Sequence, residues 1–225
     1  MTRGRVERWI LGVGRLVCAA IVVVSMVARF ERGKAWVGLP DFVAYLTIQS
    51  SAAFVVVATI GGIVALRSGL DHPRLDVARV VVLACVVTAG IVFALIVQQS
   101  GARGLALDVP WSDVALHFVL PAIAVLDWIV SPRRRRVSFR VLAVIVGYPV
   151  VWGIITMIRG PIVGWYPYYF LDPGQVDDPF EFAALSGTAL AVFAIVGVVL
   201  VAIPPRQAAF TSERRRAPAV VAPSG

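Results

Sequence analysis

Charge is what this sequence has least of. Only 15% of its 225 residues are charged, 59% are hydrophobic, and the mean hydropathy is +0.86. A soluble domain of this length does not need so much apolar sequence. The composition therefore excludes an ordinary soluble enzyme and predicts a polytopic membrane protein.

Histidine and cysteine are also scarce, with two of each. Cys18 and Cys85 fall inside apolar runs, and their spacing suits neither zinc nor redox chemistry. His72 and His117 are predicted on opposite sides of a membrane, which excludes a histidine-rich metal site. We expect no metal and no organic cofactor.

The net charge of +8 does not indicate a nucleic-acid partner. The arginines lie in short connections and tails between apolar runs, where they set the orientation of a membrane protein. The expected partner is instead the lipid bilayer. The sequence does not indicate an oligomeric state.

Long apolar runs dominate the chain. They predict an all-α, six-helix transmembrane bundle over residues 1–203, with spans at about 9–28, 42–66, 77–97, 112–130, 137–158 and 182–203. The first run is too long for a signal-peptide core, so we expect it to be retained. Residues 204–225 are rich in Pro, Ala and Arg and predict a disordered cytoplasmic tail.

Most of the 21 lysines and arginines lie in the termini and in the connections on the same side as the termini. The positive-inside rule therefore predicts that both termini are cytoplasmic, in a multi-pass protein of the plasma membrane. Three features within the spans predict particular contacts. We expect Arg15 to snorkel to the cytoplasmic face, Asp127 to pair with the nearby arginines, and Gly61 and Gly62 to permit close helix packing.

The fourth span, WSDVALHFVLPAIAVLDWIV (residues 111–130), carries an ionisable group inside an apolar helix. His117 lies about 9 Å in from the outer end at 1.5 Å per residue, a depth at which such a group suggests a functional site. Asp113, four residues earlier, shares its face and is placed to orient the ring. Pro121 leaves the His117 carbonyl without a helical partner and favours a kink.

Thr47 in the second span lies at nearly the same depth, about 7 Å in from the outer boundary. Ser50 and Ser51 follow at i+3 and i+4 on its face. A hydroxyl beside an imidazole is the minimum arrangement for nucleophilic acyl transfer, with Asp113 as the orienting third group. The alternative from the residues alone is that these hydroxyls bond backbone carbonyls and the histidine bonds a neighbouring helix.

The connection at residues 159–181, RGPIVGWYPYYFLDPGQVDDPFE, is long, aromatic and acidic. Trp165, Tyr166 and Tyr168 suit headgroup level, as in an aromatic belt beside a solvated acidic loop. A structureless connection of this length is also typical of a lid or a binding loop. Both interpretations remain open at this point.

Three motifs resemble those of a known family: YLTIQSS (45–51), LHFVLPAIAVLDW (116–128) and GWYPYYFLDP (164–173). Together they resemble the bacterial Pr6Pr family of integral membrane proteins. That family is similar to the eukaryotic androgen-induced-gene proteins, which include the androgen-dependent regulators of tissue-factor-pathway inhibitor. The eukaryotic proteins are membrane threonine hydrolases of fatty acid esters of hydroxy fatty acids. The resemblance implies Thr47 as nucleophile and His117 as the catalytic histidine.

The first hypothesis is therefore an intramembrane threonine-type hydrolase that binds a lipid ester or fatty acid. Its substrate-binding or orienting residues would be Tyr45, Ser50, Ser51, Asp113, Trp165, Tyr166 and Tyr168. The alternative is a small proton-linked transporter or a lipid-binding membrane protein without catalysis. A scaffold without chemistry is the third hypothesis.

Overall fold

The computed structural model describes residues 3–67, 73–102, 108–131, 134–176 and 178–205 of the chain. These residues form helices, and no strand occurs among them. Six helical segments are long and apolar enough to cross a membrane, which confirms the predicted all-α, six-span architecture. They are α1 (Arg3–Gly33), α3 (Leu46–Arg67), α4 (Pro73–Ala102), the fourth span (Trp111–Val130), α7 (Leu142–Val163) and α8 (Pro179–Ala202).

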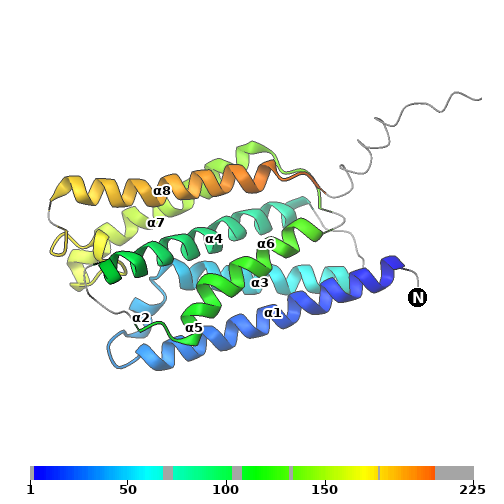
Figure 1. Ribbon diagram of the computed structural model, residues 1–225, viewed down its shortest axis with the longest axis horizontal. Coiled ribbons are helices and arrows are strands. Elements are labelled where there is room, and N and C mark those ends of the chain that lie inside the picture. Colours follow the sequence, from blue (N-terminus) through cyan, green and yellow to red (C-terminus); the bar gives the residue numbers. More distant parts are fainter. Residues whose placement is uncertain (1–2, 68–72, 103–107, 132–133, 177, 206–225) are drawn as a thin grey trace, which may run out of the picture.

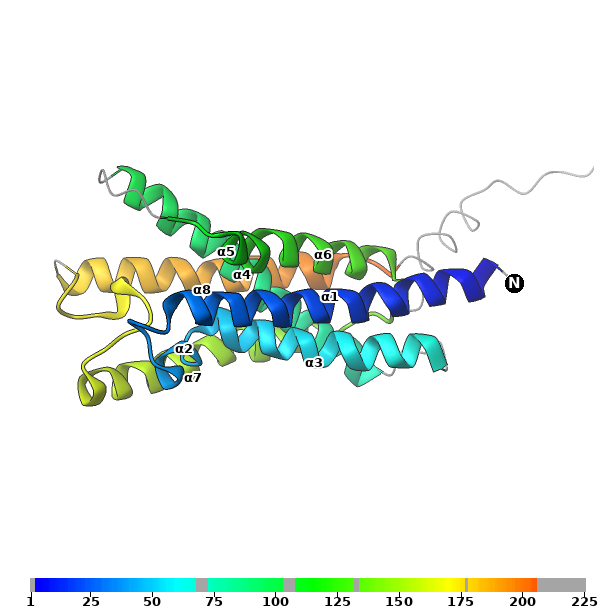
Figure 2. The same cartoon turned by 90° about the horizontal axis from the view of Figure 1, so that it is seen from below.

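The helices run nearly parallel or antiparallel in one elongated bundle, with α4 in its middle (Figures 1 and 2). Helix α4 contacts α3, α7, α8 and the fourth span, while α1 packs along α3. Val80 and Ala84 of α4 are fully buried, and Val86 is nearly so. The central helix therefore supplies much of the core.

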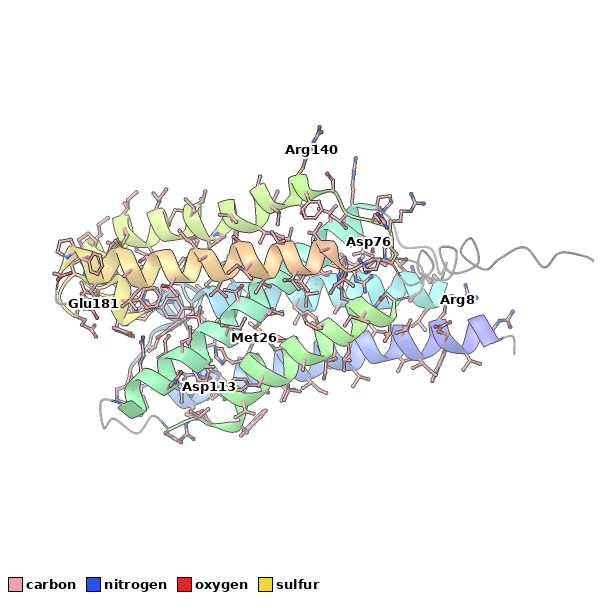
Figure 3. All side chains as sticks on the ribbon, turned by 45° about the horizontal axis from the view of Figure 1, so that its top comes forward. Arg8, Met26, Asp76, Asp113, Arg140 and Glu181 are labelled. Carbon is pink, nitrogen blue, oxygen red and sulfur yellow. The ribbon has the colours of Figure 1, made fainter. Side chains whose placement is uncertain are left out.

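The two ends of the bundle differ in chemistry. We call the end where α1 begins and α8 finishes the arginine-rich end (Figure 1); Figure 3 labels Asp76 and Arg140 there. The opposite end carries Asp113 and Glu181 in the same view, and we call it the aromatic end after Trp36, Trp111, Trp165, Tyr168 and Tyr169. Between the ends the outer surface is apolar, with Ile154, Ile155 and Ile195 each more than half exposed, as for helices that face lipid.

Glycines let α1 approach α3 closely, as the sequence predicted for Gly61 and Gly62. A Cβ added to Gly62 would lie 2.9 Å from the backbone oxygen of Gly12. Small residues at such a contact bring two backbones together where lipid gives no hydrophobic drive for association. This contact fixes the depth of α1 relative to α3.

The apolar run of the second span predicted one continuous helix from Phe42, but the structure shows a broken one. A short helix, α2 (Leu39–Phe42), is followed by a break at residues 43–45 before α3 starts at Leu46. Side chains satisfy two carbonyls of this segment: Trp152 Nε1 donates to Ala44 O at 3.0 Å, and Gln49 Nε2 donates to Val43 O at 3.0 Å. The break sets Tyr45 just outside the membrane-spanning helix.

The fourth span also departs from a regular α-helix. It comprises α5 (Trp111–Val114), a π-helical turn (Ala115–Val119) and α6 (Leu120–Val130). Pro121 cannot donate to the His117 carbonyl, and the wider π turn ends at Val119, two residues before the proline. That carbonyl packs instead against α4, where a Cβ added to Gly90 would lie 2.2 Å from His117 O. The predicted disturbance at Pro121 therefore takes the form of a π turn at a close helix contact.

The prediction that Arg15 snorkels to the membrane surface is wrong. Its side chain is only 7% exposed, and its Nε lies 2.9 Å from Asp127 Oδ1. Asp127 also pairs with Arg79 of α4, at 2.6 Å. In the described part of the chain it makes no ion pair with the arginines that follow it in sequence. Ser131 accepts from Arg15 and Arg79, at 2.9 Å and 2.7 Å. A buried charge thus finds a partner on another helix.

The expected disordered tail, residues 204–225, lies outside the described residues from 206 onward, and so does His72. The observed helices extend beyond several of the expected span limits, most of all α1, which has 31 residues.

Candidate functional site

Two cavities meet at the level of Thr47 and His117. The apolar cavity, of about 470 Å³, lies among α4, α7 and α8. The end cavity, of about 340 Å³, opens toward the aromatic end beside Arg29, Asp108 and Asp113. Five residues line both cavities: Thr47, Phe93, Ile96, His117 and Tyr168. The sequence-predicted pair therefore stands at the junction of an apolar space and a more polar one.

The apolar cavity reaches the lipid-facing surface of the bundle. Val150, Ile154 and Ile158 of α7 line it and are 38%, 56% and 62% exposed. Away from Thr47, His117 and Tyr168 at the junction, its other walls are apolar too, apart from Thr88 and Ser186. The buried hydroxyls of Thr88 and Ser186 have no hydrogen-bond partner among the described residues. A hydrocarbon chain could enter this cavity sideways from the bilayer.

His117 is held in a defined orientation by two contacts. Its Nδ1 lies 2.9 Å from the backbone oxygen of Asp113, and its ring stacks on Phe93 at 3.9 Å between centroids and 12° between planes. A carbonyl oxygen only accepts, so Nδ1 must carry the proton. Nε2 of the neutral ring is then the acceptor nitrogen, as a general base requires.

Asp113 contacts the histidine through its backbone rather than through its carboxylate. The carboxylate pairs with Arg29 of α1, whose Nε lies 2.8 Å from Oδ1. The orienting role expected for Asp113 is therefore filled by its carbonyl oxygen, and its carboxylate ties the fourth span to α1. Because Asp113 is almost fully buried, the Arg29 partner offsets the cost of placing a carboxylate there.

Thr47 lies in the first turn of α3 and is 7% exposed. Its Oγ1 lies 3.5 Å from the Tyr168 hydroxyl, which is long for a hydrogen bond. Among the described residues no hydrogen bond joins Thr47 to the His117 ring. The two side chains share a cavity wall, and catalytic hydrogen bonds of this kind often tighten only when substrate is bound.

Tyr168 brings the long connection after α7 into the site. The connection begins at Gly164, whose φ of 67° ends α7, and it includes a 3-10 turn at Tyr169–Leu171. Tyr168 packs edge-on against Tyr45 and Trp152, with centroids 5.8 Å apart in each case. Burial raises the pKa of the Tyr168 phenol, so this hydroxyl stays protonated and can donate.

The other residues expected at the site lie at differing distances from the junction. Tyr45 lines the end cavity and packs edge-on against Trp165, with 5.4 Å between the ring centroids. Trp165 itself lines neither cavity. Ser50 donates to Thr47 O at 3.0 Å within its own helix, and Ser51 is buried without a partner among the described residues. Tyr166 covers Gly160 of α7 instead.

Three contributors to this site had no signal in the sequence. Phe93 lies within an apolar run, and nothing there distinguishes it from its neighbours. In the sequence, Arg29 is one of several charged residues in a connection between spans, and Gly90 is a glycine within an apolar run. Each acts through another helix: Phe93 stacks on His117, Arg29 pairs with Asp113, and Gly90 accommodates the His117 carbonyl.

The junction places a threonine hydroxyl, an imidazole and a phenol on the wall of one apolar cavity. The described residues contain no cluster of three or more His, Cys, Asp or Glu side chains that could hold a metal ion. The groups at the junction are those of acid–base and nucleophilic chemistry.

Fold and site together define a multi-pass α-helical membrane protein with an internal cavity open to lipid. No protein-family model, curated protein or solved structure matches the chain. The resemblance suggested by the three sequence motifs therefore stays a prediction.

Proposed function

We propose that this protein is a membrane-embedded hydrolase of lipid esters, with Thr47 as nucleophile and His117 as general base. The observation that carries the proposal is the junction of the two cavities, which Thr47 and His117 both line. The fixed tautomer of His117, with Nδ1–H on the Asp113 carbonyl, supports the role of Nε2 as base.

In the proposed reaction, Nε2 of His117 removes the Thr47 hydroxyl proton as Oγ1 attacks the ester carbonyl carbon. The imidazolium returns this proton to the leaving alkoxide, which departs as the alcohol and leaves an acyl-threonine ester. A water molecule then attacks the acyl carbon, again losing its proton to Nε2. The fatty acid is released, and Thr47 regains its proton from the imidazolium.

Tyr168 is the best-placed group to stabilise the negative charge of the tetrahedral intermediate. Its hydroxyl lies 3.5 Å from Thr47 Oγ1 and remains protonated because burial raises its pKa. A preformed donor in a water-poor site stabilises developing charge far better than one in water. We assign Tyr168 to this role in preference to Tyr45, which packs behind it.

The two cavities suggest how a substrate is arranged. The acyl chain fits the apolar cavity, which it would enter from the bilayer beside Ile154 and Ile158. The alcohol portion fits the end cavity, where Arg29 and Tyr45 lie in the wall. Fatty acid esters of hydroxy fatty acids, the substrates implied by the motif resemblance, would fit this division of the site.

The proposed setting is the plasma membrane, with the arginine-rich end on the cytoplasmic side. The excess of arginine at that end supports this orientation through the positive-inside rule. The catalytic pair would then lie near the outer leaflet, under the connection that contains Tyr168.

A lipid-binding or proton-linked transport protein is the alternative, favoured by the ion pairs that the buried Arg15 and Arg79 make with Asp127 at the arginine-rich end of the bundle. Such a protein would bind or move its ligand without forming a covalent intermediate. The experiment below separates these functions, because only a nucleophilic residue reacts with an active-site-directed probe.

The test is covalent labelling of the purified full-length protein with a fluorophosphonate probe. Wild type and Thr47→Ser should label, whereas Thr47→Val should not, because the valine has the same shape without the nucleophile. His117→Gln should slow labelling by about 100-fold or more, the usual loss when a general base is removed. The matched control is Thr156→Val, a buried threonine of α7 that lines neither cavity. Equal labelling of Thr47→Val and wild type would contradict the proposal.

A further inference from the structure

Two hydroxyl groups in the wall of the apolar cavity have no role in the proposed reaction. Thr88 of α4 is 1% exposed, and its Oγ1 has no hydrogen-bond partner among the described residues. The hydroxyl of Ser186, on α8, is also buried and has no partner in the described part of the chain. Both residues line the apolar cavity, and their helices contact each other. We call Thr88 and Ser186 the hydroxyl pair.

The hydroxyl pair differs from other hydroxyls on the helices of this protein. Ser25 donates to the Ile21 carbonyl oxygen at 2.9 Å. Thr188, two residues after Ser186, donates to the Ala184 carbonyl oxygen at 2.7 Å. Serine and threonine in helices commonly bond the carbonyl four residues earlier in this way. A buried hydroxyl without a partner is costly, so such a group in a cavity wall points to a polar group of a ligand.

The hydroxyl pair lies part-way along the apolar cavity, and neither member lines the end cavity. On α4, Thr88 lies about 7.5 Å along the helix from Phe93 at the junction, toward the arginine-rich end. On α8, Phe182 lines the cavity one turn before Ser186, and Leu190 lines it one turn after. A chain whose ester carbonyl lay at the junction would therefore pass the hydroxyl pair several carbon atoms further on.

We propose that the apolar cavity binds a fatty chain that carries a hydroxyl group part-way along its length, and that the hydroxyl pair recognises this group. A hydroxyl has one donor and two acceptor positions, so it can accept from one member of the pair and donate to the other. The hydrocarbon on either side would lie against the apolar wall, which is reached from the bilayer beside Ile154 and Ile158.

The recognised hydroxyl is separate from the ester at the junction, so it adds a second point of recognition to the ligand. The inference concerns binding alone. It holds for a lipid-binding protein as well as for the proposed hydrolase, for which it would define the acyl part of the substrate.

A hydroxyl borne by a chain suits this place better than a water molecule does. A buried water is typically held by about three hydrogen bonds. Away from the junction, the hydroxyl pair supplies the only side-chain hydroxyls among the described residues that line the apolar cavity. A water beside the pair would face hydrocarbon on its remaining sides, whereas a hydroxylated chain fills the same space with carbon.

The test variants remove each hydroxyl and keep the rest of the side chain. They are Thr88→Val and Ser186→Ala, and Ser25→Ala is the matched control. Ser25 is as buried as Thr88, its hydroxyl is bonded within α1, and it lines neither the apolar nor the end cavity. Without ligand, Thr88→Val should unfold at a temperature no lower than wild type, because an apolar group of the same shape replaces an unpaired hydroxyl. A lower unfolding temperature would mean that this hydroxyl already has a partner, and it would contradict the proposal.

The measurement is binding to the full-length protein in detergent, read by native mass spectrometry as competition between methyl esters of equal chain length. The esters are methyl stearate, its mid-chain hydroxy derivative and the derivative with the hydroxyl at the end of the chain. Every protein carries Thr47→Val as its parent background, which prevents cleavage by the proposed hydrolase. A failure of the hydrolase proposal would therefore appear in the labelling experiment and not in this one.

The parent protein and Ser25→Ala should bind the mid-chain hydroxy ester about 10-fold more tightly than methyl stearate, as one net hydrogen bond would give. Thr88→Val and Ser186→Ala should each lose this preference. The proposal is overturned if the parent protein binds the three esters equally, if the chain-end derivative shares the preference, or if either variant of the hydroxyl pair keeps it.

Discussion

Replacing Gly90 by alanine would test the close contact that positions His117. A Cβ at this position would lie 2.2 Å from the His117 carbonyl oxygen, whereas real Cβ contacts of this kind do not fall below 3.0 Å. The helix α4 and the π turn must therefore separate by about 0.8 Å, the difference between these distances. Both partners are backbone-fixed, so no flexible side chain can absorb the change.

The expected cost of Gly90→Ala is about 2 kcal/mol of unfolding free energy, typical of overpacking by one methyl group in a close-packed interior. The matched variant is Gly147→Ala on α7, where an added Cβ meets nothing within 4 Å. That substitution should stabilise the helix by up to about 1 kcal/mol, since alanine is the better helix former. Thermal and denaturant unfolding in the same detergent would measure both.

Gly90→Ala should lower the rate of the proposed reaction more than it lowers the free energy of unfolding. A shift of about 1 Å in a catalytic group costs on the order of 100-fold in rate, so Gly90→Ala should react with the fluorophosphonate probe about 100-fold more slowly. Equal stability of Gly90→Ala and Gly147→Ala would refute the packing argument. Reduced stability with an unchanged labelling rate would refute the link between this contact and His117.

Three further outcomes follow from particular contacts. Asp127→Asn leaves the two arginines that it bridges without their carboxylate, and unfolding in detergent should show a loss of about 3 kcal/mol or more. Burial raises the phenol pKa values of Tyr45 and Tyr168, so above pH 10 the unfolded chain releases these protons before the folded protein does. The free energy of unfolding should therefore fall as the pH rises above 10, and it should fall less steeply in Tyr168→Phe. Gly160→Ala would place a Cβ 2.0 Å from the Tyr166 ring, so thermal unfolding should show at least about 1 kcal/mol of destabilisation.

The six spans could be predicted because the bilayer imposes a length and a polarity on each of them. Depth could also be predicted, since a fixed rise per residue from each boundary places Thr47 and His117 at one level. The structure brings both residues to the junction of the same two cavities. What the sequence could not show is that Asp113 would orient the ring through its carbonyl, because that depends on the π turn.

The sequence does not determine the rotation of each helix about its own axis, so it does not predict which neighbour a side chain faces. Arg15 lies close enough to a membrane face to snorkel, and hydropathy does not say whether it points to lipid or to α6. In the structure it points inward, to Asp127 and Ser131. Phe93 shows the same limit, since an apolar run hides which of its members stacks on His117.

The fourth span links the two ends of the molecule, and this bears on how His117 is held. Asp127, near its arginine-rich end, is bonded to α1 and α4, while Asp113, near its other end, is paired with Arg29 of α1. A helix tied at both ends cannot rotate or slide freely, so its depth and facing are set by ion pairs rather than by lipid. The histidine lies between these anchors, in a turn that Gly90 and Phe93 contact from α4. A general base needs such a rigid support, because its nitrogen must meet the nucleophile within a fraction of an ångström.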